Sequence, residues 1–223
     1  MIELRSQDGS RLAAYRAEPS SPARGAVVVI QEIFGVNHHI RAVCDGYARE
    51  GYLAIAPSLF DRIEPGLELG YDREGVTRGG GLARQLDRTL VLQDLQAAID
   101  LAASAGAGGV GVVGYCFGGT LAWLVAGHGT SVRCVSSYYG GHVVHVLDHT
   151  PRVPIILHFG DRDRMIPASD VDKVRAAHPS VPIHVYAADH GFNCTERASH
   201  DPEAARLALE RTLALFDQHL SPA

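Results

Sequence analysis

Apolar residues along this chain form short continuous runs and do not alternate regularly with polar ones. A run of this kind is typical of a strand that is buried on both faces of a sheet. The predicted buried strands are Ala26–Gln31, Leu53–Ala56, Val110–Val113, Cys134–Tyr138, Ile155–Phe159 and Ile183–Tyr186. Ahead of them, Ile2–Arg5 and Leu12–Ala17 flank an Asp8-Gly9 turn signal, which predicts a hairpin.

Between most of these strands, apolar residues recur at three- and four-residue spacing, which predicts helices with one buried face. The predicted helices are His38–Arg49, Ala83–Ala103, Gly119–Ala126, Ser169–Ala177 and Asp201–His219. Strand and helix therefore alternate over most of the chain. This alternation predicts an α/β fold with a mainly parallel central sheet and helices on both faces.

One segment departs from this alternation. Ser58–Gly81 contains six glycines, scattered charge and little periodicity. Because a long loop inside a compact domain is usually functional, we expect residues 58–83 to form a lid or insert loop over a site. No internal repeat or linker divides the rest, so the sequence predicts one domain over residues 1–223.

Composition and charge restrict the possible partners. The chain has 223 residues, 46% of them apolar and 20% charged, which suits one α/β domain. A net charge of −5 does not favour nucleic acid or an anionic membrane as a partner. The N-terminus has no signal-peptide pattern and no run is long enough to span a bilayer, so we expect a cytoplasmic protein. Its four cysteines lack CxxC spacing and would stay reduced there.

The residues from Gly114 to Gly119, GYCFGG, join a predicted strand to a predicted helix and place Cys116 at the apex of the turn. A nucleophile at such an apex adopts strained backbone angles, and flanking glycines let the strand and the helix approach each other. The helix N-terminus favours a thiolate and offers amide donors to a developing oxyanion. We therefore predict that Cys116 is a nucleophile.

Two other patterns suggest different chemistry. Residues Gly109 to Gly114 match GxGxxG, but the first two glycines begin the strand, whereas a dinucleotide fingerprint follows a strand and opens a helix. His142, His145 and His149 have the spacing of one helix face and suggest a metal-binding alternative. Their segment is rich in valine and follows a strand, which favours a solvated loop.

A thiol nucleophile needs a base, and the base needs an orienting group. In the α/β-hydrolase layout both come later in the chain, the acid before the histidine. Asp163 lies in the turn after Ile155–Phe159, with Asp161 as the alternative, and His190 follows the last predicted strand. The predicted catalytic residues are therefore Cys116, Asp163 and His190.

These motifs carry a resemblance to a known family. The QEIFGVN stretch from Gln31 to Asn37, GYCFGG, Tyr138-Tyr139-Gly140, the Gly160-x-x-Asp163 turn and His190-Gly191-Phe192 are similar to the dienelactone hydrolases, a branch of the α/β-hydrolase superfamily. The resemblance covers nearly the whole chain. It implies an α/β-hydrolase fold and hydrolysis of an anionic unsaturated lactone to maleylacetate, as in chloroaromatic degradation. It further implies a monomer, with a dimer as the alternative, and no metal or cofactor.

The resemblance also implies roles for particular residues. Glu32 would contact the resting thiol and help to generate the thiolate when substrate binds. The backbone N–H groups of Phe117 and Ile33 would form the oxyanion hole, and Tyr138 would contact the substrate.

The chain differs from the family pattern at one position. Family members place a substrate-binding arginine four residues after the catalytic histidine, where this chain has Cys194. Arg197, three residues further on, is the candidate to replace it. The resemblance also implies a second substrate-binding arginine from the loop before the long helix, for which Arg73 and Arg78 are the candidates. This difference keeps open a broad carboxylesterase or thioesterase, and from another class a non-catalytic binding module.

Overall fold

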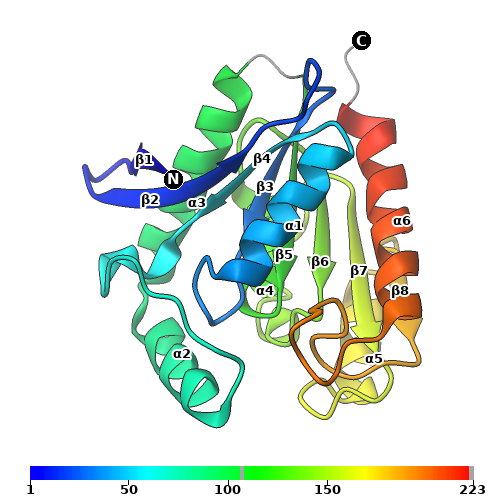
Figure 1. Cartoon of the computed structure of the whole chain (residues 1–223). Helices are drawn as coiled ribbons and strands as arrows, with labels where there is room; N and C mark the ends of the chain where they lie inside the picture. The colour runs from blue at the N-terminus through cyan, green and yellow to red at the C-terminus, as the bar shows by residue number, and fades with distance from the viewer. Residues whose placement is uncertain (106–107, 221–223) are drawn as a thin grey trace.

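The computed structural model describes residues 1–105 and 108–220, and within them eight strands form one sheet (Figure 1). Its strand order is β1-β2-β4-β3-β5-β6-β7-β8. The strands are β1 (Ile2–Arg5), β2 (Arg11–Ala17), β3 (Ala26–Ile30), β4 (Leu53–Pro57), β5 (Val110–Tyr115), β6 (Val132–Tyr138), β7 (Ile155–Gly160) and β8 (Ile183–Tyr186). The strands from β4 to β8 in this order are parallel, and β1 and β2 join them as an antiparallel edge, as the sequence predicts.

Helices cover both faces of the sheet. They are α1 (His38–Arg49), α2 (Arg73–Gln85), α3 (Arg88–Ser104), α4 (Phe117–His128), α5 (Ala168–Ala177) and α6 (Pro202–Leu220), with short 3-10 turns η1 (Leu59–Arg62) and η2 (Val143–His145). α1 and α6 pack on one face, where Tyr47 and Phe216 meet, and α3 and α4 pack on the other. Among the described residues, no helix is both long enough and apolar enough to cross a membrane.

The prediction of a loop over residues 58–83 is wrong in part, because this segment contains η1 and most of α2. Asp72 caps α2 by accepting a hydrogen bond from the amide of Gly75 at 2.7 Å. Gly79 lets the helix approach the Ile33 carbonyl so closely that a Cβ would lie 1.9 Å from its oxygen. The glycines that suggest a loop by their low helix propensity are therefore used for close packing.

The single helix predicted over Ala83–Ala103 is also wrong, because it is divided. Ala83 belongs to the last turn of α2, and α3 starts afresh at Arg88. Asp87 caps the new helix by accepting hydrogen bonds from the amides of Thr89 and Leu90. The same apolar spacing continues across the break, so periodicity alone gives no sign of it.

The turn between β5 and α4 is very closely packed. A Cβ at Gly114 would lie 1.9 Å from the Gly118 carbonyl oxygen, and a Cβ at Gly118 would lie 2.4 Å from that of Ile30. A Cβ at Gly119 would lie 2.5 Å from the carbonyl oxygen of Tyr138. The first turn of α4 therefore rests directly on the ends of β3 and β6.

These contacts predict opposite effects for two glycine-to-alanine changes. Gly114→Ala should lower the free energy of unfolding by about 1–3 kcal/mol, because the new methyl group meets backbone that cannot move aside. Gly81→Ala, on α2 with open space around its Cβ, should raise it by up to about 1 kcal/mol through helix propensity. Urea unfolding measures both. Equal stability of the two variants would contradict the packing described for the turn.

Candidate active site

Cys116 stands at the junction of β5 and α4, at the carboxyl edge of the parallel strands. Its backbone has φ 54° and ψ −114°, a strained conformation for a residue with a side chain. The strain is held by hydrogen bonds: the Cys116 amide donates to the Tyr138 carbonyl at 2.9 Å, and the Cys116 carbonyl accepts from Gly119. As the N-cap of α4, the thiol lies at the positive end of the helix dipole.

His190 connects Cys116 to Asp163. Its Nε2 lies 3.2 Å from the Cys116 Sγ, and its Nδ1 lies 2.7 Å from Asp163 Oδ2. The other oxygen of Asp163 accepts hydrogen bonds from the amides of Met165 and Ile166. Asp161 is exposed, so the structure selects Asp163 from the two candidates of this turn.

The acid turn and the histidine loop are held side by side. Gly160 ends β7 so close to the histidine loop that a Cβ there would lie 2.2 Å from the Ala188 carbonyl oxygen. The Arg162 amide donates to that same carbonyl at 3.0 Å. This contact fixes the separation of Asp163 and His190, because each lies within two residues of it.

The surroundings of His190 favour its charged form. Burial lowers the pKa of the imidazole, but the negative charge of Cys116 and the Asp163 carboxylate outweigh burial, and the pKa of His190 is raised to about 10. This direction favours a protonated ring beside the sulfur, the arrangement that activates a cysteine nucleophile.

The two predicted oxyanion donors lie in the first turn of α4 and in the loop after β3. The Phe117 amide is in the first turn of α4, where no earlier carbonyl of the helix is available to accept its hydrogen bond. Ile33 lies in the loop after β3, and its carbonyl packs against Gly79. Gly118 of α4 rests on the end of β3. The close contact between β3 and α4 thus brings both donors to the carboxyl edge of the sheet.

Glu32 is fully buried, and its surroundings differ from what the resemblance implies. Its Oε1 lies 3.5 Å from Nη1 of Arg197, while no hydrogen bond among the described residues joins it to Cys116. Burial raises its pKa, against the opposing charges of Arg197 and His190. The thiol contacts His190 in this structure, and Glu32 contacts Arg197.

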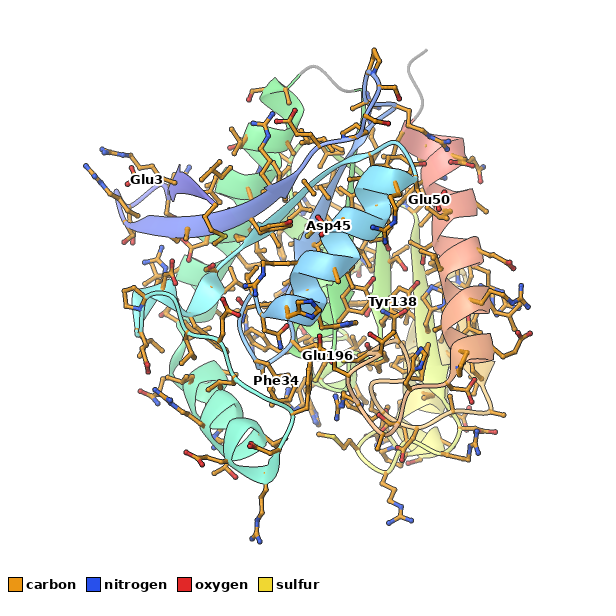
Figure 2. The ribbon with its side chains drawn as sticks, viewed as in Figure 1. Glu3, Phe34, Asp45, Glu50, Tyr138 and Glu196 are labelled. Carbon is orange, nitrogen blue, oxygen red and sulfur yellow. The ribbon has the colours of Figure 1, made fainter. Side chains whose placement is uncertain are left out.

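The three candidate arginines have different positions. The Arg197 side chain is 19% exposed, lies over the rings of Phe34 and Tyr71, and approaches Gly191, the neighbour of His190. Phe34 and Glu196, which neighbour the site on two loops, are labelled in Figure 2. By contrast, Arg78 pairs with Glu64 at 2.6 Å on the outside of α2, and Arg73 is exposed. Arg197 is the candidate that the fold brings to the site.

Tyr138 does not point into the site, so its prediction as a substrate contact is wrong. Its side chain is fully buried, and its hydroxyl bonds to Thr212 of α6 at 2.9 Å. β6 ends at Tyr138, and the residue after the strand faces the site. Tyr139 has a φ of 39°, lies 5.1 Å from the His190 ring, and has a buried hydroxyl with no hydrogen-bond partner.

The motif Tyr138-Tyr139-Gly140 marks this place in the sequence, but it does not say which tyrosine faces the site. Tyr71 and His39 lie beside Glu32 and Arg197. No sequence motif predicts that these two residues belong to the site. Tyr71 belongs to the glycine-rich segment, and His39 is one of 12 histidines.

The three histidines of the metal-binding alternative do not form a site. His149 faces His128, with its Nδ1 2.6 Å from Nε2 of that residue, while His142 and His145 are exposed beside η2. In the part of the chain that the structure describes, they form no group of three close ligands.

Fold and site together define an α/β hydrolase with a cysteine in the strained turn. The dienelactone hydrolase family model matches residues 12–220, so the chain belongs to that family. The protein is accordingly a hydrolase.

Relatives of known name support this assignment. The carboxymethylenebutenolidase of Pseudomonas putida is 35% identical, over 95% of this chain and 93% of its own. A Synechocystis protein provisionally named carboxymethylenebutenolidase is 37% identical over 94% and 93%. A solved structure from Klebsiella pneumoniae, provisionally named dienelactone hydrolase, has a TM-score of 0.86 at 33% identity and covers 98% of both chains.

The charge of His190 predicts how the thiol reacts with iodoacetamide. At about pH 6.5 Cys116 should be alkylated rapidly, and in His190→Gln at least tenfold more slowly, with reactivity recovering only above about pH 8.5. The reason is that a thiolate persists at low pH only beside the imidazolium. The pH profile of alkylation, followed by mass spectrometry, measures this.

The other thiols provide the control. Burial raises the pKa of Cys134 to about 12 and that of Cys194 to about 11, and Cys44 is raised further, so these thiols stay protonated. Cys116→Ala should therefore lose the rapid reaction. An unchanged profile in His190→Gln would contradict the ion pair.

Proposed function

We propose that this chain opens an unsaturated lactone that bears a carboxylate, through an acyl-enzyme on Cys116. The observation that supports it most is the unbroken contact from Asp163 through His190 to the Cys116 sulfur, at 2.7 and 3.2 Å. A nucleophile, its base and an orienting acid in this arrangement suit acyl transfer. The relatives' name, carboxymethylenebutenolidase, supplies the substrate class.

In the first step, the Cys116 thiolate attacks the lactone carbonyl and forms a carbon–sulfur bond. The carbonyl electrons move to oxygen, where the amides of Phe117 and Ile33 stabilise the oxyanion. When the intermediate collapses, the ring carbon–oxygen bond breaks, and the leaving oxygen takes the proton from Nε2 of His190. The product at this stage is an open chain attached to Cys116 as a thioester.

In the second step, the neutral His190 takes a proton from water, which attacks the thioester carbonyl. Collapse of this intermediate releases the carboxylate product and restores the thiolate beside the imidazolium. Asp163 stabilises the imidazolium in both steps and holds the ring orientation through its bond to Nδ1. The buried hydroxyl of Tyr139, which has no partner, is available to a substrate oxygen next to His190.

Arg197 is the proposed partner of the substrate carboxylate. Its guanidinium is mostly buried next to the histidine loop, and Glu32, its present partner, lies 3.5 Å away. A substrate carboxylate that binds Arg197 therefore competes with Glu32. Arg197 would therefore bind the substrate carboxylate in place of the family's arginine, whose position is occupied by Cys194 in this chain.

A carboxylesterase or thioesterase is the second candidate, and one observation favours it. Two of the three predicted arginines, Arg73 and Arg78, lie at the surface of α2. A site with one guanidinium that is already paired with Glu32 is less selective for an anion than a site with several.

We also infer a cytoplasmic monomer. All four cysteines are free thiols, which suits a reducing compartment. Every residue of the proposed mechanism comes from one chain, so a second copy is not needed to complete the site.

Two substrates compared side by side test the reaction. The protein should hydrolyse a dienelactone with a higher kcat/KM than a neutral aryl ester, and Cys116→Ala should lose both activities by at least about 1000-fold. Stopped-flow assays under acyl-enzyme burst conditions measure the rates, and mass spectrometry detects the thioester. Aryl-ester turnover without dienelactone turnover would favour the esterase instead.

A pair of arginine variants tests substrate selection. Arg197→Met should lower kcat/KM for the dienelactone about 30-fold, equivalent to about 2 kcal/mol, and change neutral-ester hydrolysis much less. Arg78→Met, at the surface, should leave both rates within about twofold. Equal losses on both substrates in Arg197→Met would mean that this arginine does not select a carboxylate.

A further inference from the structure

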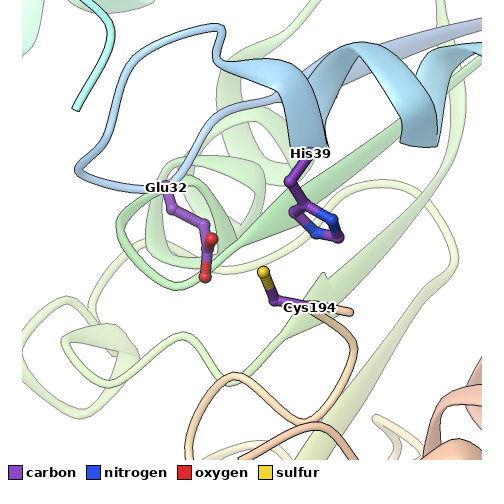
Figure 3. A group of neighbouring side chains, drawn as sticks. All are labelled: Glu32, His39 and Cys194. Atoms are coloured by element: carbon purple, nitrogen blue, oxygen red, sulfur yellow. The ribbon is translucent and has the colours of Figure 1, made fainter. Parts of the chain in front are cut away.

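Three potential metal ligands lie together beside the catalytic residues. They are Glu32 in the loop after β3, His39 in the first turn of α1, and Cys194 in the loop after β8 (Figure 3). One ligand atom from each lies within 4.8 Å of the others, and no side chain of the three is more than 3% exposed. Figure 3 shows the Cys194 sulfur directed between the Glu32 carboxylate and the His39 ring.

Two atoms of this group are buried and have no hydrogen-bond partner. They are Oε2 of Glu32 and Nε2 of His39. The remaining carboxylate oxygen, Oε1, faces Arg197, so the two oxygens of Glu32 have separate surroundings. Buried polar atoms are normally satisfied, so a carboxylate oxygen and a ring nitrogen without partners in one group of three point to a missing ligand.

The chemistry of the donors selects the class of ion. A thiolate, an imidazole and a carboxylate are the ligand types of zinc, whereas magnesium and calcium prefer oxygen alone. Nε2 of His39 is buried without a hydrogen-bond partner, and a neutral imidazole can offer a lone pair at that atom. On binding, Cys194 would release its proton, and the charges of the resulting thiolate and of the Glu32 carboxylate would neutralise a divalent ion, while Arg197 keeps its contact with Oε1.

The geometry allows such a site with small movements. Tetrahedral zinc sites place their ligand atoms about 3.3–3.7 Å apart, so atoms now within 4.8 Å of each other need to close by about 1 Å. Side-chain rotation of Cys194 and Glu32 provides this. Three protein ligands leave a fourth position open for water or another small ligand.

We propose that Glu32, His39 and Cys194 bind a divalent cation of the zinc class. This site is separate from the contact between Cys116 and His190, and the hydrolysis described above requires no metal. The inference therefore does not depend on the proposed reaction. Glu32 belongs to both sites, so a bound ion would hold it in place.

Cobalt(II) is the probe for this site, because its spectrum reports thiolate ligation. Cys116→Ala removes the nucleophile as a competing ligand, and this full-length variant is stripped with a chelator and titrated with cobalt chloride. We expect one equivalent to bind, with a near-ultraviolet sulfur-to-cobalt charge-transfer band and the visible bands of tetrahedral coordination. Zinc should displace the cobalt and abolish both.

Ligand variants in the same background assign the site. Adding Cys194→Ser should remove the charge-transfer band, and adding His39→Gln should weaken cobalt binding at least tenfold. Adding His142→Gln is the matched control: this histidine is exposed and outside the group, so the titration should not change. Circular dichroism of each variant checks that it is folded.

Three results would overturn the proposal. One is the absence of a charge-transfer band in the Cys116→Ala protein, a result that needs no variant of the ligands. A second is an undiminished band in folded Cys194→Ser protein, which would assign the ion to another thiol. The third is loss of binding in His142→Gln, which would assign it to the histidines around η2.

Discussion

The approach of α4 to the ends of β3 and β6 is the constraint on which the rest of the site depends. Gly118 rests on the carbonyl of Ile30 and Gly119 on that of Tyr138, at distances that exclude any side chain. This contact holds Cys116 in its strained conformation and brings the Phe117 amide beside the loop after β3. One packing arrangement therefore positions the proposed nucleophile, the N-terminus of α4 with its dipole, and the proposed oxyanion donors.

Charge is distributed around the thiol in two pairs. Cys116 and His190 form one, with Asp163 behind the imidazole, and Glu32 and Arg197 form the other. Both are largely buried, so water screens them little and each strongly affects the protonation of its members. In the proposed reaction, the substrate anion binds at the second pair, while the chemistry takes place at the first.

The sequence predicts the sheet, most helices and the chain-ordered catalytic residues, because buried strands and glycine-flanked turns have local signatures. It also marks QEIFGVN, whose parts have physical roles: Gln31 accepts from the amide of Leu59, Gly35 has φ +80°, and Asn37 caps α1. It does not predict which tyrosine of Tyr138-Tyr139 faces the site. That choice depends on the backbone conformation after β6, which is set by tertiary contacts: the Tyr139 amide donates to the His158 carbonyl of β7, and α4 packs against the end of β6.

Gly79 links the position of α2 to the proposed oxyanion hole. The backbone of α2 rests on the carbonyl of Ile33, and the amide of that residue is a proposed oxyanion donor. Any displacement of α2 to admit a larger substrate must also shift this peptide unit. Substrate size and transition-state stabilisation are consequently coupled in this protein, and a change of specificity achieved by remodelling α2 would be accompanied by a change in catalytic power.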